Sequence, residues 1–217
     1  MSPGLKHAAV AAVAAAVLGA LLLGSPGTFA SLNATKTGSS VVITSGTITA
    51  SVAGPTTGTV STGTAPAGVV VDAGSVGIIP GIQAQTLTYS VTNSSSSASP
   101  AAISSIRVVS TSITDATRWG HIQPYLAVTV AVNGGSAVAV PSSAITSTGI
   151  DATISGTVNV QPGATVPVVI SFTIPATSGT IDLLRQLQPD RSSALTIASI
   201  IGLAPVFTLT QTSIAAP

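Results

Sequence analysis

Residues 126–140 read LAVTVAVNGGSAVAV, which is two alternating apolar runs separated by Asn133-Gly134-Gly135. Apolar residues that alternate with small or polar ones follow the period of a β-strand, whose side chains point to opposite faces in turn. An Asn-Gly pair supplies the positive φ angles that a tight hairpin turn requires. The stretch therefore predicts a β-hairpin, with strands over 126–132 and 136–140.

The same period of two recurs along most of the chain. It is clearest over residues 85–93, where Leu87, Tyr89 and Val91 share one face and hydroxyl-bearing residues share the other. Such a pattern indicates a strand with one buried face. Further strands are predicted over 42–52, 68–72, 103–112, 152–160, 165–174 and 194–214, the last interrupted near Gly202 and Pro205.

Other segments read as turns, loops or short helices. Pro80-Gly81 and Pro162-Gly163 each precede a strand and read as turns, and the Gly/Thr/Pro-rich residues 54–66 read as a loop. Residues 180–188 predict a short helix, and residues 114–123 a helical turn or a structured loop. Eight or nine short strands with little helix predict an all-β antiparallel sandwich, with one or two short helices in its connections.

The chain is unusually poor in charge. Charged residues make up 5% of its 217 residues, against roughly 25% in an ordinary soluble domain. Six Lys and Arg face five Asp and no Glu, so removal of Lys6 with a leader would leave five charges of each sign. The footprint of nucleic-acid binding, a basic patch, is missing. Low charge instead favours association with other protein surfaces.

The N-terminus has the pattern of a signal peptide. A basic tip at Lys6 precedes an apolar run over residues 8–23, and Thr28 and Ala30 then occupy the −3 and −1 positions of a cleavage site. The run is shorter than the roughly 20 apolar residues of a membrane-spanning helix. We therefore expect a signal peptide over 1–30, cleavage between Ala30 and Ser31, and a single exported domain over 31–217 that is free of the membrane.

The absence of cysteine bears on both stability and chemistry. An exported domain without disulfides must be stabilised by its core and by its strand ladders. Thiol catalysis, cysteine-based zinc sites and a lipid-anchored cysteine are excluded.

Three stretches carry a family resemblance. Residues 26–34, PGTFASLNA, resemble the end of the signal peptides of the TasA/camelysin family. Residues 45–52, SGTITASV, are similar to the strand that follows the cleavage site in that family, and residues 79–93, IPGIQAQTLTYSVTN, are similar to a later element. Order and spacing agree over roughly the first 110 residues, since signal, strand and element follow one another as they do there.

The resemblance implies both a fold and a function. Members are exported bacterial proteins that a dedicated signal peptidase processes, and several are fibre subunits of the biofilm matrix. It implies a jelly-roll variant of the sandwich and a secreted, cell-surface or matrix location. The partners would be other copies of the chain or a related subunit, with signal peptidase acting during export.

Functional side chains are densest between residues 115 and 125. Asp115, Arg118, Trp119, His121 and Tyr125 could contact a glycan or a matrix partner, with the two aromatic rings as stacking platforms. The same residues could equally form a loop that is packed around the single Trp and carries a surface ion pair. A monomeric surface binding module is therefore an alternative function.

Catalysis finds little support in the residues. Camelysin has been described as a metalloprotease, but zinc hydrolysis needs about three protein ligands and a general base. After cleavage the chain would keep one His, His121, and no Glu, and its five Asp are scattered singly. We predict no catalytic, cofactor or metal site, and an exported protease is the least favoured alternative.

The preferred interpretation is a fibre subunit that assembles by strand donation. An exposed sheet edge can pair with an extended segment of another chain. The mature N-terminus lacks proline, and it runs from Ser31 and Leu32 to Val41, Val42 and Ile43. These residues are the candidate donor strand.

Overall fold

The structure is a computed structural model that describes residues 33–37, 50–63, 77–95, 100–175 and 195–211. The chain separates into two units, Met1–Ser31 and Leu32–Pro217, and all the described residues belong to the second. Several predictions fall outside the described residues: the signal peptide over 1–30, its cleavage site at Ala30 and Ser31, donor residues Leu32, Val41, Val42 and Ile43, the strand over 68–72 and the helix over 180–188.

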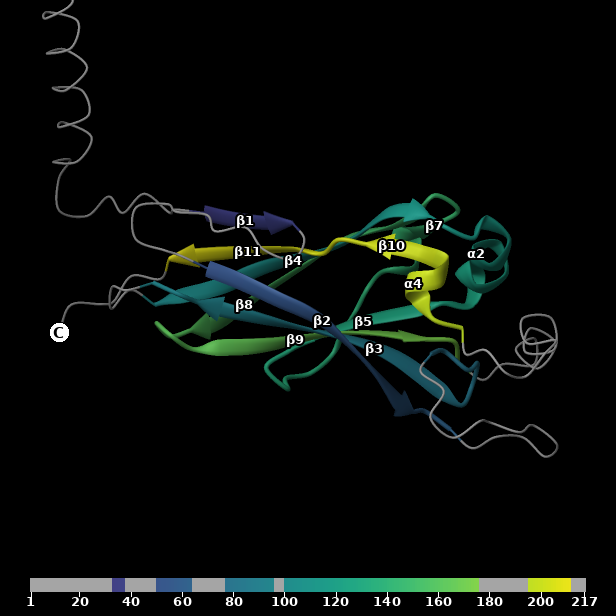
Figure 1. Cartoon of the computed structure of the whole chain (residues 1–217), viewed down its shortest axis with the longest axis horizontal. Helices are drawn as coiled ribbons and strands as arrows, with labels where there is room; N and C mark the ends of the chain where they lie inside the picture. Colours follow the sequence, from purple (N-terminus) through teal and green to yellow (C-terminus); the bar gives the residue numbers. More distant parts are fainter. Residues whose placement is uncertain (1–32, 38–49, 64–76, 96–99, 176–194, 212–217) are drawn as a thin grey trace, which may run out of the picture. The chain divides into compact units, whose positions relative to one another are not determined.

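The described residues form two antiparallel sheets, as predicted (Figure 1). Sheet I has the order β1 (Asn33–Thr37), β11 (Val206–Gln211), β4 (Ala101–Ile113), β8 (Gly149–Val160) and β7 (Ile145–Thr146), with β10 (Ile201–Leu203) also paired to β4. Sheet II has the order β2 (Ala50–Ser61), β3 (Gln83–Asn93), β9 (Thr165–Thr173), β5 (Ala127–Val132) and β6 (Val138–Ala139).

The strand pairs are nested in the sequence, which is the arrangement of a jelly roll. The first strand β1 pairs with the last strand β11, β3 pairs with β9, β4 pairs with β8, and β5 pairs with β6. A single long antiparallel ribbon folded over on itself produces this pattern and divides its strands between two sheets. Strand β2 is an addition that extends sheet II beyond β3. The jelly-roll expectation is therefore confirmed.

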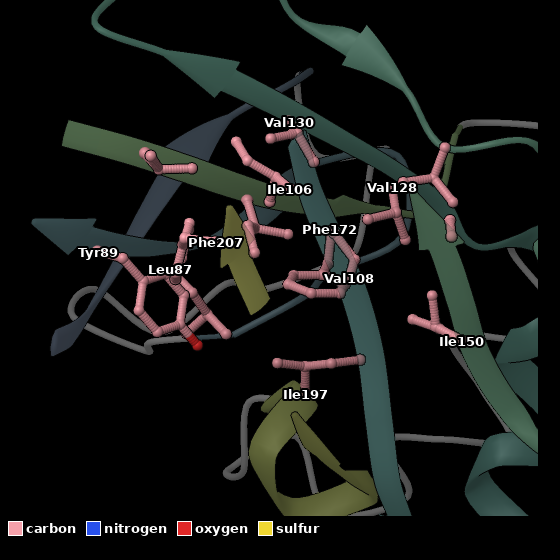
Figure 2. Packing of buried hydrophobic residues seen from close by; sticks show 14 of the residues in the cluster. Leu87, Tyr89, Ile106, Val108, Val128, Val130, Ile150, Phe172, Ile197 and Phe207 are labelled. Atoms are coloured by element: carbon pink, nitrogen blue, oxygen red, sulfur yellow. The ribbon is translucent and has the colours of Figure 1, made fainter. Parts of the chain in front are cut away.

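The core lies between the two sheets and follows from the period of two. On β3, Leu87, Tyr89 and Val91 are buried, whereas Thr88 and Ser90 on the other face are half-buried. Figure 2 shows side chains of β3, β5 and β9 of sheet II meeting those of β4 and β11 of sheet I. Two aromatic rings join the sheets, since Tyr89 and Phe207 lie 5.5 Å apart between ring centroids.

The predicted turns are present where residues with positive φ permit them. Asn133 and Gly134 adopt φ of 52° and 70° and join β5 to β6, as the Asn-Gly signal predicts. The second strand of this hairpin is shorter than expected, because only Val138 and Ala139 pair with β5. Gly81 and Gly163 also have positive φ, in the two Pro-Gly turns.

Two predictions about the strands are wrong. Residues 54–66 were expected to form a loop, but β2 continues through them to Ser61. A register shift between Ala53 and Thr56 takes Pro55, which has no N–H to donate, out of the ladder.

The other error lies within residues 194–214, predicted as strand, where Ile197–Ile200 forms the short helix α4. Ile197 and Ile200 are both fully buried, and their spacing of three fits one helical turn as well as it fits a strand. The prediction for residues 114–123 left two possibilities open. The structure has helix α2 (Ala116–Ile122) followed by the 3₁₀-helix η1 (Gln123–Tyr125).

Candidate functional site

Asp115 starts helix α2 and occupies the corner where the functional side chains were expected to gather. Its side-chain Oδ1 accepts a hydrogen bond from the backbone N–H of Arg118 at 2.9 Å, which makes it the N-cap. Its Oδ2 lies 3.5 Å from Nε of Arg118 in a partly exposed ion pair. The backbone N–H groups of Thr114 and Asp115 donate to the carbonyl of Ile200, so the corner is tied to α4. Asp115 therefore has a structural role already.

Trp119 lies inside the corner and is only 1% exposed. Its indole Nε1 donates to the carbonyl oxygen of Thr146 at 3.0 Å, and Nε2 of Gln123 donates to the carbonyl of Ile145 at 2.8 Å. Both acceptors belong to β7, so these two side chains pin α2 and η1 to the edge of sheet I. The ring of Trp119 would have to leave the core before it could stack on a ligand.

The other two residues of the expected binding loop are exposed. His121, in the last turn of α2, is exposed, and Tyr125, at the end of η1, is 43% exposed. The structure thus keeps the five residues at one corner, but it separates the buried Trp119 from the exposed Tyr125. None of the five lines the cavity described below.

The charges of the described residues lie on one side of the fold. Arg107 on β4 and Asp151 on β8 form a bidentate pair with N–O distances of 2.7 and 2.6 Å, and about half of each side chain is exposed. The hydrogen bond from Arg107 lowers the pKa of Asp151. The remaining described charges are Lys36 on β1 of sheet I, Asp115 at the N-cap of α2 and Arg118 within α2. The five strands of sheet II contain no charged residue.

An apolar cavity lies where the two sheets open toward β6 and β8. Its volume is about 210 Å³, and no charged residue lines it. Its lining comes from β4, the β5–β6 hairpin and β8: Ile103, Ser105, Ile106, Val130, Val132, Gly135, Ser136, Val138, Ile154, Ser155, Gly156 and Val158. We refer to this cavity as the β6–β8 slot. Sequence reasoning missed it, because its residues are distant in the chain and each reads as an ordinary strand residue.

The buried polar side chains serve the fold. Oε1 of Gln85 accepts from the backbone N–H of Ile197 at 2.6 Å and so fixes the start of α4. Nδ2 of Asn93 donates to the carbonyl of Val160 at 3.0 Å, which joins the end of β3 to the end of β8. Neither residue lines the slot. Their positions are explained by structure alone.

Strand β1 occupies one end of sheet I, and it belongs to the N-terminal segment that was predicted to donate a strand. Asn33–Thr37 pairs with β11 through five residue pairs, from Asn33 opposite Thr210 to Thr37 opposite Val206. Among the described residues, β11 is its only strand partner. The last strand of the jelly roll therefore accepts an N-terminal segment along its outer edge.

Neither the described residues nor known proteins point to a metal site, a membrane-spanning helix or a family. Within these residues no group of three or more His, Cys, Asp or Glu could hold a metal ion. No helix among them is long and apolar enough to cross a membrane. Comparison of the chain with protein-family models, with curated proteins and with solved structures found no match.

Proposed function

We propose that this protein is an exported structural subunit of a cell-surface or extracellular fibre. Subunits assemble when residues 31–43 of one copy add as a strand to the next copy. The partner is a second copy of the chain or a related subunit, and signal peptidase releases the N-terminus during export.

The pairing of β1 with β11 is the observation that best supports this proposal. A strand at the end of a sheet, held along one side by five residue pairs, can be exchanged for the same strand of another copy. The exchanged strand makes identical main-chain hydrogen bonds, so exchange requires no new recognition surface. A strand held within its own copy closes a monomer, whereas the same strand given to a neighbour links two copies.

The composition fits an assembling protein. The five described strands of sheet II carry no charge, and the whole chain has 5% charged residues, so few charges must lose water when copies meet. The rival interpretation, a binding module that uses Trp119, is disfavoured by the burial of that ring and by its hydrogen bond to Thr146.

Removal of the donor residues tests the proposal. Residues 31–217 should form filaments that electron microscopy detects, whereas a variant that starts at residue 41 should remain a folded monomer by circular dichroism and light scattering. A synthetic peptide of residues 31–43 should bind that variant, because the β11 edge is then free. A variant that lacks residues 212–217 is the matched truncation. Filaments of normal length and number from the variant that starts at residue 41 would refute strand donation.

A further inference from the structure

The β6–β8 slot opens between two strand edges, one from each sheet. Among the described strands, β6 ends sheet II and pairs only with β5, over two residues. Strand β8 meets β7 only at Gly149 and Ile150, so residues 155–160 have no strand partner other than β4 in the part of the chain that the structure describes. The slot is therefore accessible to a chain that approaches from outside the sandwich.

A bulge in β8 accounts for the opening. Ile103 pairs with Val158 but Ser105 pairs with Ser155, so Gly156 and Thr157 together oppose a single residue of β4. Such a bulge bends its strand and increases the local twist. At Gly156 a Cβ atom would meet nothing within 4 Å, which shows how open this part of the edge is.

The slot is apolar at a position where the surface should be polar. Val138 stands at its rim and is 48% exposed, and Ile154 and Val158 are among the β8 residues that line it. An apolar cavity of this order is large enough for a small hydrocarbon group, and filling it removes apolar surface from water. The matching occupant is an aliphatic side chain on an uncharged strand.

The described residues offer one such side chain on a free edge. Val60, at 54%, is the most exposed large hydrophobic residue among them, and it lies on β2. Beyond its register shift, β2 runs regularly from Thr56 to Ser61, and within the described residues it pairs only with β3. This half of the strand contains no charge and no proline, which are the usual protections of an edge against pairing.

The two features lie on opposite sides of the sandwich. Strand β2 is at one end of sheet II, and the slot is bounded by β6 at the other end. Val60 therefore cannot fill the slot of its own copy, but it can fill the slot of a neighbour. A contact between two different surfaces leaves one of each free at the ends, so it propagates from copy to copy into a row that stays open unless it closes into a ring.

We propose that Val60 on the β2 edge of one copy inserts into the β6–β8 slot of the next. This inference rests on the proposed role as an assembling subunit, but it uses a contact that involves none of residues 31–43. The contact aligns copies side to side. Because six residues of a strand span only about 20 Å, it buries less than the roughly 800 Å² per partner of a stable complex. One such contact therefore holds two copies together only weakly, whereas many of them along a row stabilise the row.

Cysteine trapping tests the contact directly, because the chain has no cysteine of its own. Protein with Val60→Cys is mixed with protein with Val138→Cys under mild oxidation, and dimers are counted on a non-reducing gel. The matched control replaces Val138→Cys with Thr117→Cys, which places an exposed thiol on α2, away from the slot. We expect the mixed dimer to form at least about tenfold faster than the control, because docking raises the effective concentration of the two thiols.

Three results would overturn the proposal. The first is a mixed dimer that forms no faster than the Thr117→Cys control. The second is trapping that favours the Val60→Cys homodimer, which would mean that two β2 edges pair with each other. The third uses Thr59→Cys as the thiol on β2, with Val60 either kept or replaced by Val60→Lys. A trapping rate with Val138→Cys that Val60→Lys does not lower would mean that Val60 does not enter the slot.

The same trapping separates this inference from strand donation. Protein that starts at residue 41 and carries the two cysteine replacements should still give the mixed dimer, even though it forms no donated-strand filaments. Filaments without trapping would leave strand donation standing and remove the side contact. Trapping without filaments would support the side contact and argue against strand donation.

Discussion

The corner formed by α2 and η1 and the open edges at β1, β2 and β8 differ in the chemistry that they display. The corner holds the single Trp, an ion pair and the only described His, yet its groups bind one another and the carbonyls of β7. The free half of β2 and residues 155–160 of β8 hold no charged residue, and β1 holds one, Lys36. Yet among the described residues these edges are the parts with unused pairing capacity. In this chain, with so few charged side chains, the polar and aromatic groups of the corner therefore stabilise the fold.

Truncation of Trp119 should have the largest effect and tests the structural side of this comparison. Trp119→Ala leaves a cavity and removes the bond to Thr146, so we expect a loss of about 3–5 kcal/mol in the free energy of unfolding. Urea unfolding followed by circular dichroism measures it. Tyr125→Ala, at the exposed end of the same corner, should change stability little. Equal stability of Trp119→Ala and the wild type would mean that the corner is free to bind something else.

Alkaline titration tests the packing beneath the β1 edge, because Tyr89 packs on Phe207 of β11, the strand that pairs with β1. Burial raises the pKa of Tyr89 from 10.0 to about 12. Between these values the unfolded chain releases the phenolic proton and the folded chain keeps it. Stability should therefore be unchanged at neutral pH and fall above pH 10, by at most about 1.4 kcal/mol per pH unit.

Chemical unfolding at a series of pH values from 7 to 12 measures this decline. Tyr89→Phe should abolish the part of the decline that belongs to Tyr89, whereas Tyr125→Phe, which alters an exposed tyrosine, should retain it. A decline that Tyr89→Phe leaves intact would show that the ring is not buried in solution.

Replacement of the α2 cap should have the smallest effect of the three. Asp115→Ala removes the acceptor for the Arg118 N–H and should cost about 1 kcal/mol. Asp115→Asn keeps an acceptor and loses only the partly exposed charge pair, so its stability should lie closer to that of the wild type. The difference in urea midpoint between the two variants separates the contribution of the capping hydrogen bond from that of the ion pair. Equal losses would assign the role of Asp115 to its charge.

Much of the fold follows from local patterns. The alternation over 85–93, the Asn133-Gly134 turn and the strands near 103–112, 152–160 and 165–174 appear as predicted, because each depends on residues close in the sequence. The errors fall where distant partners decide. β3 pairs with β2 through residues 56–61 beyond a register shift, and the amide of Gln85 accepts the N–H that begins α4.

The candidate sites show the same division. Composition and short-range periodicity are local properties, and they were enough to predict an all-β chain of low charge with a hairpin turn at 133–134. They also located the stretch from 115 to 125 where functional side chains are densest. The three-dimensional arrangement was needed to find that Trp119 is buried, that β1 lies against β11, and that residues of β4, β5, β6 and β8 enclose an apolar slot. Burial and edge exposure depend on which strands become neighbours, and in a jelly roll those neighbours come from opposite ends of the chain.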